Sequence, residues 1–354
     1  MSKPILSALL SVKSFDLNDT EKYLFEKHNP AGVILLNRNM SSVEQVTKLI
    51  KSIKEAIGRD DVIIALDAEG GRVNPLNLIN FPKYASQNIL GLADDKNLTS
   101  LHAKLIANNM KEIGANLTFA PVLDIHYPDI TIALKNRCFS SDKEKIVFHG
   151  KVLCNTYINE GICPCIKHIP GHGRAVNDPH AELPIIDYSL KDLEDDFYPF
   201  MQLNSMPMAM SAHILLSQID NKKPITLSPK GISEIIRGFI GFNGLLISDA
   251  IDMHALKGNI VERATSAWDA GCDMVCYCCG HEDELIALCK NGRYMEDISL
   301  QRLEKIKQII MQKKETNVLD NELKAYYSAI SNFTEEHVNY SADVVLQNLK
   351  KGEN

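Results

Sequence analysis

Residues Ser42–Arg72 read SVEQVTKLIKSIKEAIGRDDVIIALDAEGGR, and this stretch contains the unit from which we predict the fold. Its first half, Ser42–Ile57, has apolar side chains at helical spacing and lysines on the opposite face, which indicates an amphipathic helix. Val62–Leu66 is a continuous apolar run, typical of a strand that is buried on both faces in a parallel sheet. Polar residues follow at once, from Asp67 to Arg72. The stretch therefore predicts a helix, a buried strand and a polar loop at the carboxyl end of that strand.

The same unit recurs along the chain, because short apolar runs alternate with stretches of helical spacing. Further helices are predicted at Leu101–Ile113 and Ser228–Ile240. The eight runs that we predict as strands are Ile5–Leu10, Val33–Leu36, Val62–Leu66, Leu117–Leu123, Ile162–Ile166, Met208–Ala212, Leu245–Ile247 and Met274–Tyr277. Eight strands that alternate with helices predict an α/β fold of the (β/α)8 TIM-barrel type. A doubly wound open sheet is the alternative, although no glycine-rich dinucleotide fingerprint follows the first strand.

The length of 354 residues suits either one large barrel or two ordinary domains. No linker rich in proline, glycine or serine interrupts the sequence, so we predict a single domain over residues 1–354. From about Asp297 the sequence is polar and helical, and we expect this tail, residues 297–354, to pack against the barrel. The apolar face of the tail comprises Leu300, Leu303, Ile306, Ile309 and Ile310.

Charge and hydropathy exclude two classes of partner. The chain has 38 basic and 45 acidic side chains, hence a net charge of −7, which argues against a general nucleic-acid binder. No apolar run approaches the roughly 20 residues that span a bilayer. Pro4–Val12 is too short and too weakly charged for a signal peptide, so we predict that it is a buried first strand.

The nine cysteines predict a reducing, cytoplasmic location. Their number is odd and several lie inside apolar runs, which is unlike a disulfide framework. Cys163 and Cys165 with the later cysteines match no standard zinc-ligand spacing, so we expect no metal there.

Polar residues gather where the predicted strands end. These positions are Asp67–Arg72, Asp124, Lys167–Gly173, His213 and Ser248-Asp249. The carboxyl ends of all strands meet on one face of a (β/α)8 barrel, and that face carries the chemistry in this fold. We therefore expect these side chains to form one site.

Five segments of the chain together resemble the signature of bacterial family 3 glycoside hydrolases, and more narrowly their β-N-acetylhexosaminidase branch. The segments are Gly32–Leu36 (GVILL), Asp67–Val73 (DAEGGRV), Ala120–Asp124 (APVLD) with Asn136–Phe139 (NRCF), Lys167–Arg174 (KHIPGHGR) with Asp178-Pro179-His180, and Gly244–Met253 (GLLISDAIDM). The resemblance runs from the N-terminus to about residue 280. Three positions depart from the family pattern: Pro75 stands where a basic residue is common, Pro179 where a small residue is usual, and Cys138 where serine is usual.

The resemblance implies a catalytic role for three residues. Asp249 would be the nucleophile that forms a covalent glycosyl-enzyme, and Asp178 with His180 would form the acid/base pair. A histidine suits proton transfer near neutral pH, because its ordinary pKa is near 6.5. The residues alone leave alternatives open: Asp249 as a rim carboxylate paired with a cation, and His180 as an exposed loop side chain. Glu69 is the next candidate for the proton donor.

The resemblance also implies that Asp67, Arg137, Lys167 and His168 contact the hydroxyl groups of the sugar. Structural alternatives are an ion pair of Lys167 with Asp124, an ion pair of Asp67 with Arg72, and a surface ion pair for Arg137. The histidines at 168, 172, 180 and 213 fit no recognised ligand pattern, and the family requires no metal. We expect neither a metal nor another cofactor.

The sequence thus predicts a cytoplasmic, monomeric, retaining β-N-acetylglucosaminidase. Its expected substrate is a small muropeptide or disaccharide, N-acetylglucosaminyl-anhydro-N-acetylmuramic acid with or without peptide, as in peptidoglycan recycling. Alternatives are a family 3 β-glucosidase, a phosphorylase of the same fold and a sugar-binding protein without catalysis. The β-glucosidases usually carry a further domain, and Ser341–Asn348 (SADVVLQN) resembles the lead into one.

Overall fold

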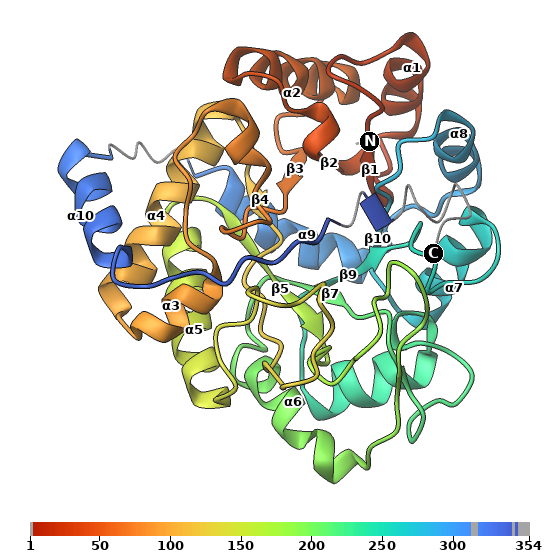
Figure 1. The fold of residues 1–354 in the computed structure, drawn as a ribbon. Coiled ribbons are helices and arrows are strands. Elements are labelled where there is room, and N and C mark those ends of the chain that lie inside the picture. Colours follow the sequence, from red (N-terminus) through yellow and green to blue (C-terminus); the bar gives the residue numbers. More distant parts are fainter. Residues whose placement is uncertain (1–2, 313–317, 342–343, 346–354) are drawn as a thin grey trace.

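The computed structural model describes residues 3–312, 318–341 and 344–345, and its centre is a closed barrel of eight parallel strands (Figure 1). The strands, in their order around the barrel, are β1 (Leu6–Ser11), β10 (Met274–Cys276), β9 (Leu245–Ala250), β7 (Met208–Ser211), β5 (Cys163–Ile169), β4 (Leu117–Thr118), β3 (Ile63–Leu66) and β2 (Pro30–Ile34). Each predicted apolar run overlaps one of these strands. The predicted (β/α)8 barrel is confirmed, and the open doubly wound sheet is wrong.

The first strand of the barrel is the segment that we distinguished from a signal peptide. β1 is buried along its whole length and pairs in parallel with both β2 and β10. The prediction of a buried strand at this position is therefore confirmed.

The strand β4 is much shorter than the predicted run Leu117–Leu123. Pro121 has no N–H to donate, which interrupts a regular ladder. The chain nevertheless stays beside β5, because Lys167 N donates to the Pro121 carbonyl at 3.1 Å and Leu123 N donates to the Lys167 carbonyl at 2.7 Å. This irregular pairing keeps the polar ends of the two strands together.

Helices connect the barrel strands and cover the outside of the barrel. They are α1 (Asp19–His28), α2 (Val43–Ile57), α3 (Gln87–Ala93), α4 (Lys96–Ile113), α5 (Lys143–Asn159), α6 (Leu190–Gln202), the π-helix η4 (Gly231–Phe239), α7 (Ile260–Ala270) and α8 (Glu282–Asn291). Short 3-10 turns lie at η1 (Asn37–Asn39), η2 (Pro75–Ile79) and η3 (Ile225–Leu227). Outside the barrel, β6 (Ile185–Ile186) pairs in parallel with β8 (Leu215–Leu216).

Helix boundaries follow capping residues, and one of the predicted helices begins at a different residue for that reason. Ser42 caps α2 through a hydrogen bond from Gln45 N, and α2 matches the helix predicted over Ser42–Ile57. α4 begins earlier than Leu101, because Asp95 accepts hydrogen bonds from Asn97 N and Leu98 N. The helix predicted from Ser228 is confirmed, because the chain is helical from Pro229 and continues as the π-helix over Gly231–Phe239, and Gly231 N–H donates to Ser228 Oγ at 2.9 Å.

The helix α9 (Asp297–Ile310) closes the amino-terminal end of the barrel. Leu303 and Ile306 belong to the same apolar cluster as the side chains that fill the barrel interior. The segment before α9 is tied to the start of β1, since Met295 N donates to the Ile5 carbonyl at 2.8 Å. Figure 1 shows α9 behind the strands. The prediction that the tail packs against the barrel is confirmed here, although Leu300 remains 38% exposed.

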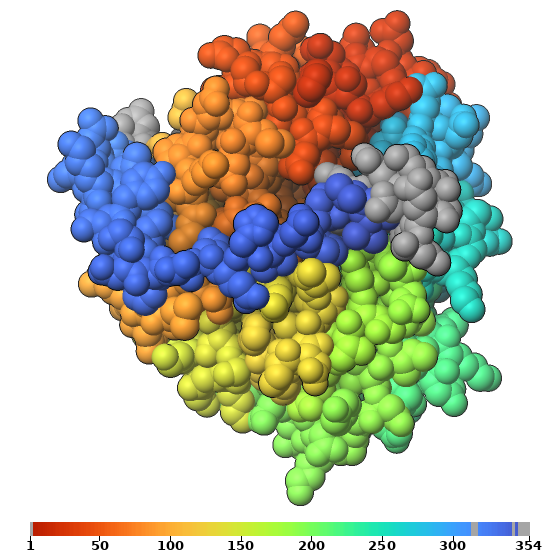
Figure 2. All heavy atoms as spheres, in the orientation of Figure 1, coloured from red at the N-terminus to blue at the C-terminus, as the bar shows by residue number. Residues whose placement is uncertain are grey.

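The end of the chain turns to the opposite face. α10 (Asp320–Ile330) packs on α4, and its Tyr326 is fully buried. Residues 331–341, which we call the strap, then run without helix across the face where the strands end (Figures 1 and 2). Among the described residues of the tail, the strap interrupts the helical structure, which resumes at residues 344–345, whereas we expected a helix-rich segment throughout. Most of Ser341–Asn348 lies outside the described residues. Within the described residues, no helix is long and apolar enough to cross a membrane.

Candidate active site

A pocket of about 500 Å³ opens at the carboxyl ends of the strands. Six of the seven predicted site residues line it: Asp67, Arg137, Lys167, His168, His180 and Asp249. The seventh, Asp178, lies directly behind His180. The barrel therefore brings together residues that are up to 182 positions apart in sequence, from Asp67 to Asp249, as the strand-end argument predicts.

Asp249 is the second-last residue of strand β9, and its side chain is partly buried in the wall of the pocket. Its Oδ1 accepts a hydrogen bond from Ala250 N at 2.8 Å. Burial raises the pKa of Asp249, but the nearby His213 and His168 and the Ala250 N–H outweigh burial and lower the pKa to about 2. The carboxylate is therefore ionised at neutral pH, as a nucleophile must be.

The Asp178–His180 pair lies on the loop that follows β5. His180 Nδ1 donates to Asp178 Oδ1 at 2.8 Å, and the His180 backbone N–H donates to the same oxygen at 2.9 Å. Burial raises the pKa of Asp178, but the hydrogen bonds from His180 and from Tyr340 have a larger, opposite effect. The pKa of Asp178 is therefore below its ordinary value. The loop is held by Ala255 N, which donates to the carbonyl of the buried Pro179 at 3.2 Å. The imidazole is thus oriented by an ionised carboxylate, which leaves Nε2 for proton transfer.

Glu69 is the centre of a buried ion-pair network. This network differs from all three ion pairs that we considered as structural alternatives for Lys167, Asp67 and Arg137. Arg137 donates two hydrogen bonds to Glu69, at 2.9 and 2.8 Å, and Lys167 Nζ lies 2.5 Å from Glu69 Oε1 and 2.8 Å from Asp67 Oδ1. Lys167 therefore pairs with Asp67 and Glu69 and not with Asp124, and Arg137 is a buried rather than a surface partner. Asp67 accepts from Lys167, whereas Arg72 donates to the Ala133 carbonyl at 2.6 Å.

The same network argues against Glu69 as the proton donor. Burial raises the pKa of Glu69, but Arg137 and Lys167 outweigh it and lower the pKa to about 2. A carboxyl group that holds two cations and stays ionised at neutral pH has no proton to give. The ion pairs with Arg137 and Lys167 therefore disfavour the alternative that we kept for Glu69.

Asp124 organises the histidines that follow β5. His168 Nδ1 donates to Asp124 Oδ2 at 2.7 Å, and His172 N donates to Asp124 Oδ1 at 2.7 Å. The His172 ring is buried at the pocket wall with no hydrogen-bond partner among the described residues. Burial, with the neighbouring His168, lowers the pKa of His172 to about 4, so its imidazole is neutral. His172 thus contributes a neutral ring to the pocket wall, and its two nitrogens are shielded from solvent.

The glycine pair Gly70-Gly71 explains how the chain turns away from β3 without blocking the pocket. Both residues have positive φ, and Glu69 N donates to the Val73 carbonyl at 3.0 Å to close the turn. A Cβ at Gly70 would lie 2.3 Å from the Ala85 carbonyl oxygen. Only glycine fits there, and the turn directs Arg72 and Val73 toward the mouth of the pocket.

The three departures from the family pattern have different consequences in the structure. Pro75 lines the pocket, so it shapes the mouth where the family commonly has a basic side chain. Cys138 is fully buried in a small apolar cluster with Val122, Ile130 and Leu134, away from the pocket surface. Pro179 is buried within the loop, between Asp178 and His180, and it lines the pocket.

Sequence reasoning missed the contribution of the strap. Tyr340 and Ser341 line the pocket, and the Tyr340 hydroxyl contacts both members of the acid/base pair. Tyr340 follows no strand and belongs to no motif that we recognised, so only the folded chain reveals its position. Arg72 was seen only as a partner for Asp67, yet its guanidinium lies 5.0 Å from the centre of the Tyr340 ring.

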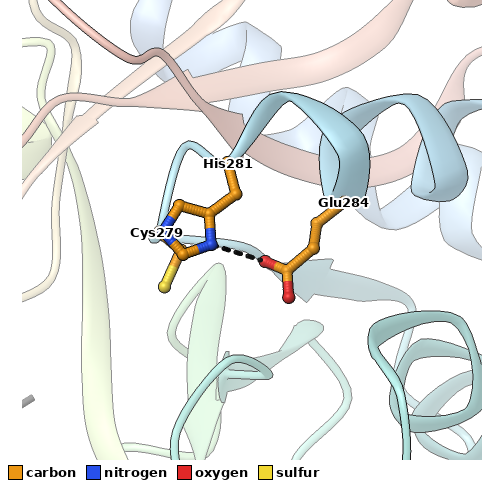
Figure 3. Close-up of side chains that lie close together, drawn as sticks. All are labelled: Cys279, His281 and Glu284. Atoms are coloured by element: carbon orange, nitrogen blue, oxygen red, sulfur yellow. Dashed lines mark ion pairs between the residues drawn. The ribbon is translucent and has the colours of Figure 1, made fainter. Parts of the chain in front are cut away.

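One group of side chains among the described residues has the spacing of a metal site, and it lies beside the pocket (Figure 3). Cys279, His281 and Glu284 have ligand atoms within 4.8 Å of one another, and His281 Nδ1 is 3.6 Å from Glu284 Oε2. This group differs from the cysteine and histidine sets considered from the sequence. Burial raises the pKa of Cys163 and Cys165, which disfavours the thiolates that would bind a metal.

Comparisons with known proteins agree with this geometry. The model of the glycosyl hydrolase family 3 N-terminal domain matches residues 6–312. A β-hexosaminidase of Chromobacterium violaceum is 34% identical over 289 residues, which are 78% of this chain and 80% of that protein. A β-hexosaminidase of Bordetella avium is 32% identical over 281 residues, 76% and 79% of the two chains.

Solved structures give the same result at the level of the fold. NagZ from Neisseria gonorrhoeae, in complex with N-trifluoroacetyl-D-glucosamine, superposes with a TM-score of 0.79 at 28% identity and covers 93% of this chain and 98% of its own. A family 3 β-N-acetylglucosaminidase from Paenibacillus has a TM-score of 0.78 at 25% identity, with 91% of this chain and 66% of its own covered. Because the family model spans most of the sequence and the named relatives exceed 30% identity, the chain belongs to glycosyl hydrolase family 3 and is a glycoside hydrolase related to the β-hexosaminidases of that family.

Proposed function

We propose that the protein is a retaining β-N-acetylglucosaminidase in which Asp249 is the nucleophile and His180 is the acid/base. The observation that carries this proposal is the placement of an ionised carboxylate and a carboxylate-oriented imidazole on the same pocket. Retaining hydrolysis requires a nucleophile and a group that first gives and later takes a proton. The names of the relatives supply the class of sugar.

In the first step, an Asp249 carboxylate oxygen attacks the anomeric carbon and the bond from that carbon to the leaving oxygen breaks. His180 gives the proton on Nε2 to the leaving oxygen, so the aglycone departs as an alcohol. Asp178 favours this step because it holds Nδ1–H and stabilises the charged imidazole. A histidine in this role also avoids a second carboxylate close to Asp249.

In the second step, water attacks the anomeric carbon of the glycosyl-enzyme. The neutral His180 takes a proton from the water on Nε2, the bond to Asp249 breaks, and N-acetylglucosamine leaves with retained configuration. Asp67, Lys167 and His168, which line the pocket, would hold the sugar hydroxyls, together with Arg137. Arg137 has N–H groups beyond those that bind Glu69 and the Ala133 carbonyl.

The proposed substrate is a small peptidoglycan fragment, N-acetylglucosaminyl-anhydro-N-acetylmuramic acid with or without peptide. Arg38 and Arg72 line the pocket, which suits an aglycone that carries carboxylates. We propose a cytoplasmic, monomeric enzyme with one barrel domain over residues 1–354. The proposal of a cytoplasmic, reducing compartment is based on the cysteines, of which seven are buried as free thiols.

The proposal is tested with aryl β-glycosides of graded leaving-group pKa and with a slow fluorinated N-acetylglucosaminyl donor. The wild-type protein should release N-acetylglucosamine faster than glucose, and the slow donor should add one sugar to the peptide that contains Asp249. Asp249→Ala should form no adduct and lose at least on the order of a thousandfold in kcat, because the nucleophile is gone. His180→Ala should lose most on poor leaving groups, and Asp178→Ala should show the same bias more weakly.

The matched control is Asp187→Ala, which removes an exposed carboxylate outside the pocket and should leave all these rates unchanged. If Asp249→Ala kept half the activity, or if His180→Ala had the wild-type dependence on the leaving group, the assignment would be wrong. Faster turnover with added phosphate would instead favour a phosphorylase, and preferred release of glucose would favour a β-glucosidase.

A further inference from the structure

The strap, residues 331–341, is attached to the rest of the protein at several points along its length. Asn136 Nδ2 donates to the Glu336 carbonyl at 2.6 Å, and Lys135 Nζ pairs with Glu336 Oε1 at 2.8 Å. At its start, Phe333 packs against the main apolar core. Figure 2 shows the strap across the centre of the face on which the strands end. The contacts are specific, so the strap has a defined position over the site.

Tyr340 is the residue of the strap that reaches the acid/base pair. Its hydroxyl lies 2.7 Å from Asp178 Oδ2 and 3.1 Å from His180 Nδ1. Its ring is partly buried and is covered by the guanidinium of Arg72 at 5.0 Å. The Tyr340 side chain is therefore held in the site by a hydrogen bond at its hydroxyl and by a cation–π contact at its ring.

The donors and acceptors of this contact can be assigned from their chemistry. Asp178 Oδ1 is occupied by His180, so Oδ2 is the oxygen that accepts the tyrosine O–H. Burial and the Asp178 carboxylate raise the pKa of Tyr340, which keeps the phenol protonated as a donor. The phenol oxygen can in turn accept from His180 Nδ1–H, which already donates to Asp178. All three groups then favour the tautomer with the proton on Nδ1.

We propose that Tyr340 is a positioning residue for the Asp178–His180 pair, and that the strap forms the wall of the pocket on the side where the leaving group departs. The wall follows from geometry, because the acid/base must lie beside the leaving oxygen and both Tyr340 and Ser341 line the pocket next to it. This inference rests on the proposed function and extends it to a segment outside the family match, which ends at residue 312.

The first test is Tyr340→Phe, which removes the hydroxyl and keeps the ring on Arg72. On substrates with poor leaving groups kcat should fall on the order of tenfold, as expected for the loss of a hydrogen bond to a charged group, while KM stays unchanged. On activated aryl glycosides, which leave with little protonation, the loss should be less than about twofold. The matched control is Tyr327→Phe, whose hydroxyl donates to the Lys83 carbonyl near the same end of the chain. This control should behave as wild type in every assay.

The second test is Tyr340→Ala, which also removes the ring. If the strap is a wall of the pocket, KM for a disaccharide substrate should rise above that of Tyr340→Phe, whereas KM for a small aryl glycoside should change little. Equal KM values for both variants on the disaccharide would contradict the wall. Thermal unfolding of each variant within about 2 °C of wild type shows that the fold persists, since this position contributes little to the core.

Failure of this inference can be separated from failure of the proposed function. Suppose that His180→Ala changes the dependence of kcat on the leaving group and that Tyr340→Phe does not. Tyr340 then has no positioning role, while the acid/base role of His180 stands. If neither variant alters the dependence on the leaving group, the acid/base assignment itself is wrong and the inference falls with it.

Discussion

At the scale of single residues, the ion pairs around Glu69 couple the stability of the fold to the proposed binding of the sugar. Glu69 is buried, and both Arg137 and Lys167 direct their charges at it. A residue that only bound sugar could be removed without harm to the fold. These two cations instead neutralise a buried carboxylate, so a substitution at either position has two effects that a simple activity assay would confuse.

A double-mutant cycle separates the two effects. Arg137→Ala should lower the free energy of unfolding by about 3–5 kcal/mol, because it leaves part of a buried charge uncompensated. The double variant Arg137→Ala/Glu69→Gln should regain much of that stability but should not regain affinity for the sugar. The measurements are denaturant unfolding and KM on one aryl N-acetylglucosaminide. Equal stability of the single and double variants would show that the buried charge of Glu69 does not need Arg137 for its neutralisation.

At the scale of secondary-structure elements, a buried histidine joins α4, α10 and the turn after β3. His102 Nδ1 contacts the Tyr326 hydroxyl at 2.9 Å, and Nε2 lies 3.3 Å from the Glu69 carbonyl. Burial lowers the pKa of His102 from 6.5 to about 4. The helix α10, which leads into the strap, is therefore attached to the barrel through a neutral imidazole.

This contact predicts a loss of stability in weak acid. Between about pH 6.5 and about pH 4 the unfolded chain binds a proton at His102 and the folded chain does not, so the free energy of unfolding falls as the pH falls. The part due to His102 is at most about 3 kcal/mol. His102→Gln keeps a hydrogen-bonding group without a titrating ring, so its stability should change less with pH over this range.

Unfolding in urea at several pH values measures this effect. The control is His254→Gln, an exposed histidine whose removal should leave the wild-type slope unchanged. His172, whose pKa burial also lowers to about 4, remains in both variants and keeps part of the slope. A His102→Gln slope equal to that of wild type would mean that the imidazole is not excluded from water in the folded chain.

At the scale of the whole molecule, the end of the chain closes the barrel at one end and crosses it at the other. α9 covers the amino-terminal opening, and the strap lies over the carboxyl-terminal opening that holds the pocket (Figure 1). The two openings have different surroundings. The first is lined by apolar side chains, whereas the second is lined by ion pairs and histidines. We therefore expect the first closure to contribute to stability, and the second is the one for which we propose a role in catalysis.

The first closure can be tested without touching the site. Leu303→Ala on α9 should lower the free energy of unfolding by about 2–5 kcal/mol, because it leaves a cavity at the end of the barrel interior. Leu300→Ala on the same helix should cost less than about 1 kcal/mol, since that side chain is 38% exposed. Both variants should keep the wild-type KM. A similar loss at the two positions would contradict the burial of Leu303.

The sequence by itself determined the barrel and the strand-end residues of its site. Continuous apolar runs require burial on both faces, and parallel strands place their carboxyl ends on one face, so the positions of Asp67, Lys167 and Asp249 follow from local patterns. The shortness of strand β4 could also have been predicted, because Pro121 lies within the apolar run and cannot donate a backbone hydrogen bond. These features depend on the identity of neighbouring residues, which is the information that a sequence displays directly.

Only the tertiary structure decided which charges pair and where the tail lies. Several carboxylates and cations are equally close to strand ends in sequence, and the selection of Glu69 as the common partner of Arg137 and Lys167 depends on distances across the barrel. The contact of Tyr340 with Asp178 joins residues 162 positions apart, through a strap with no periodic pattern. Such a contact is stabilised by geometry that the whole fold creates, and for that reason no local pattern in the sequence predicts it.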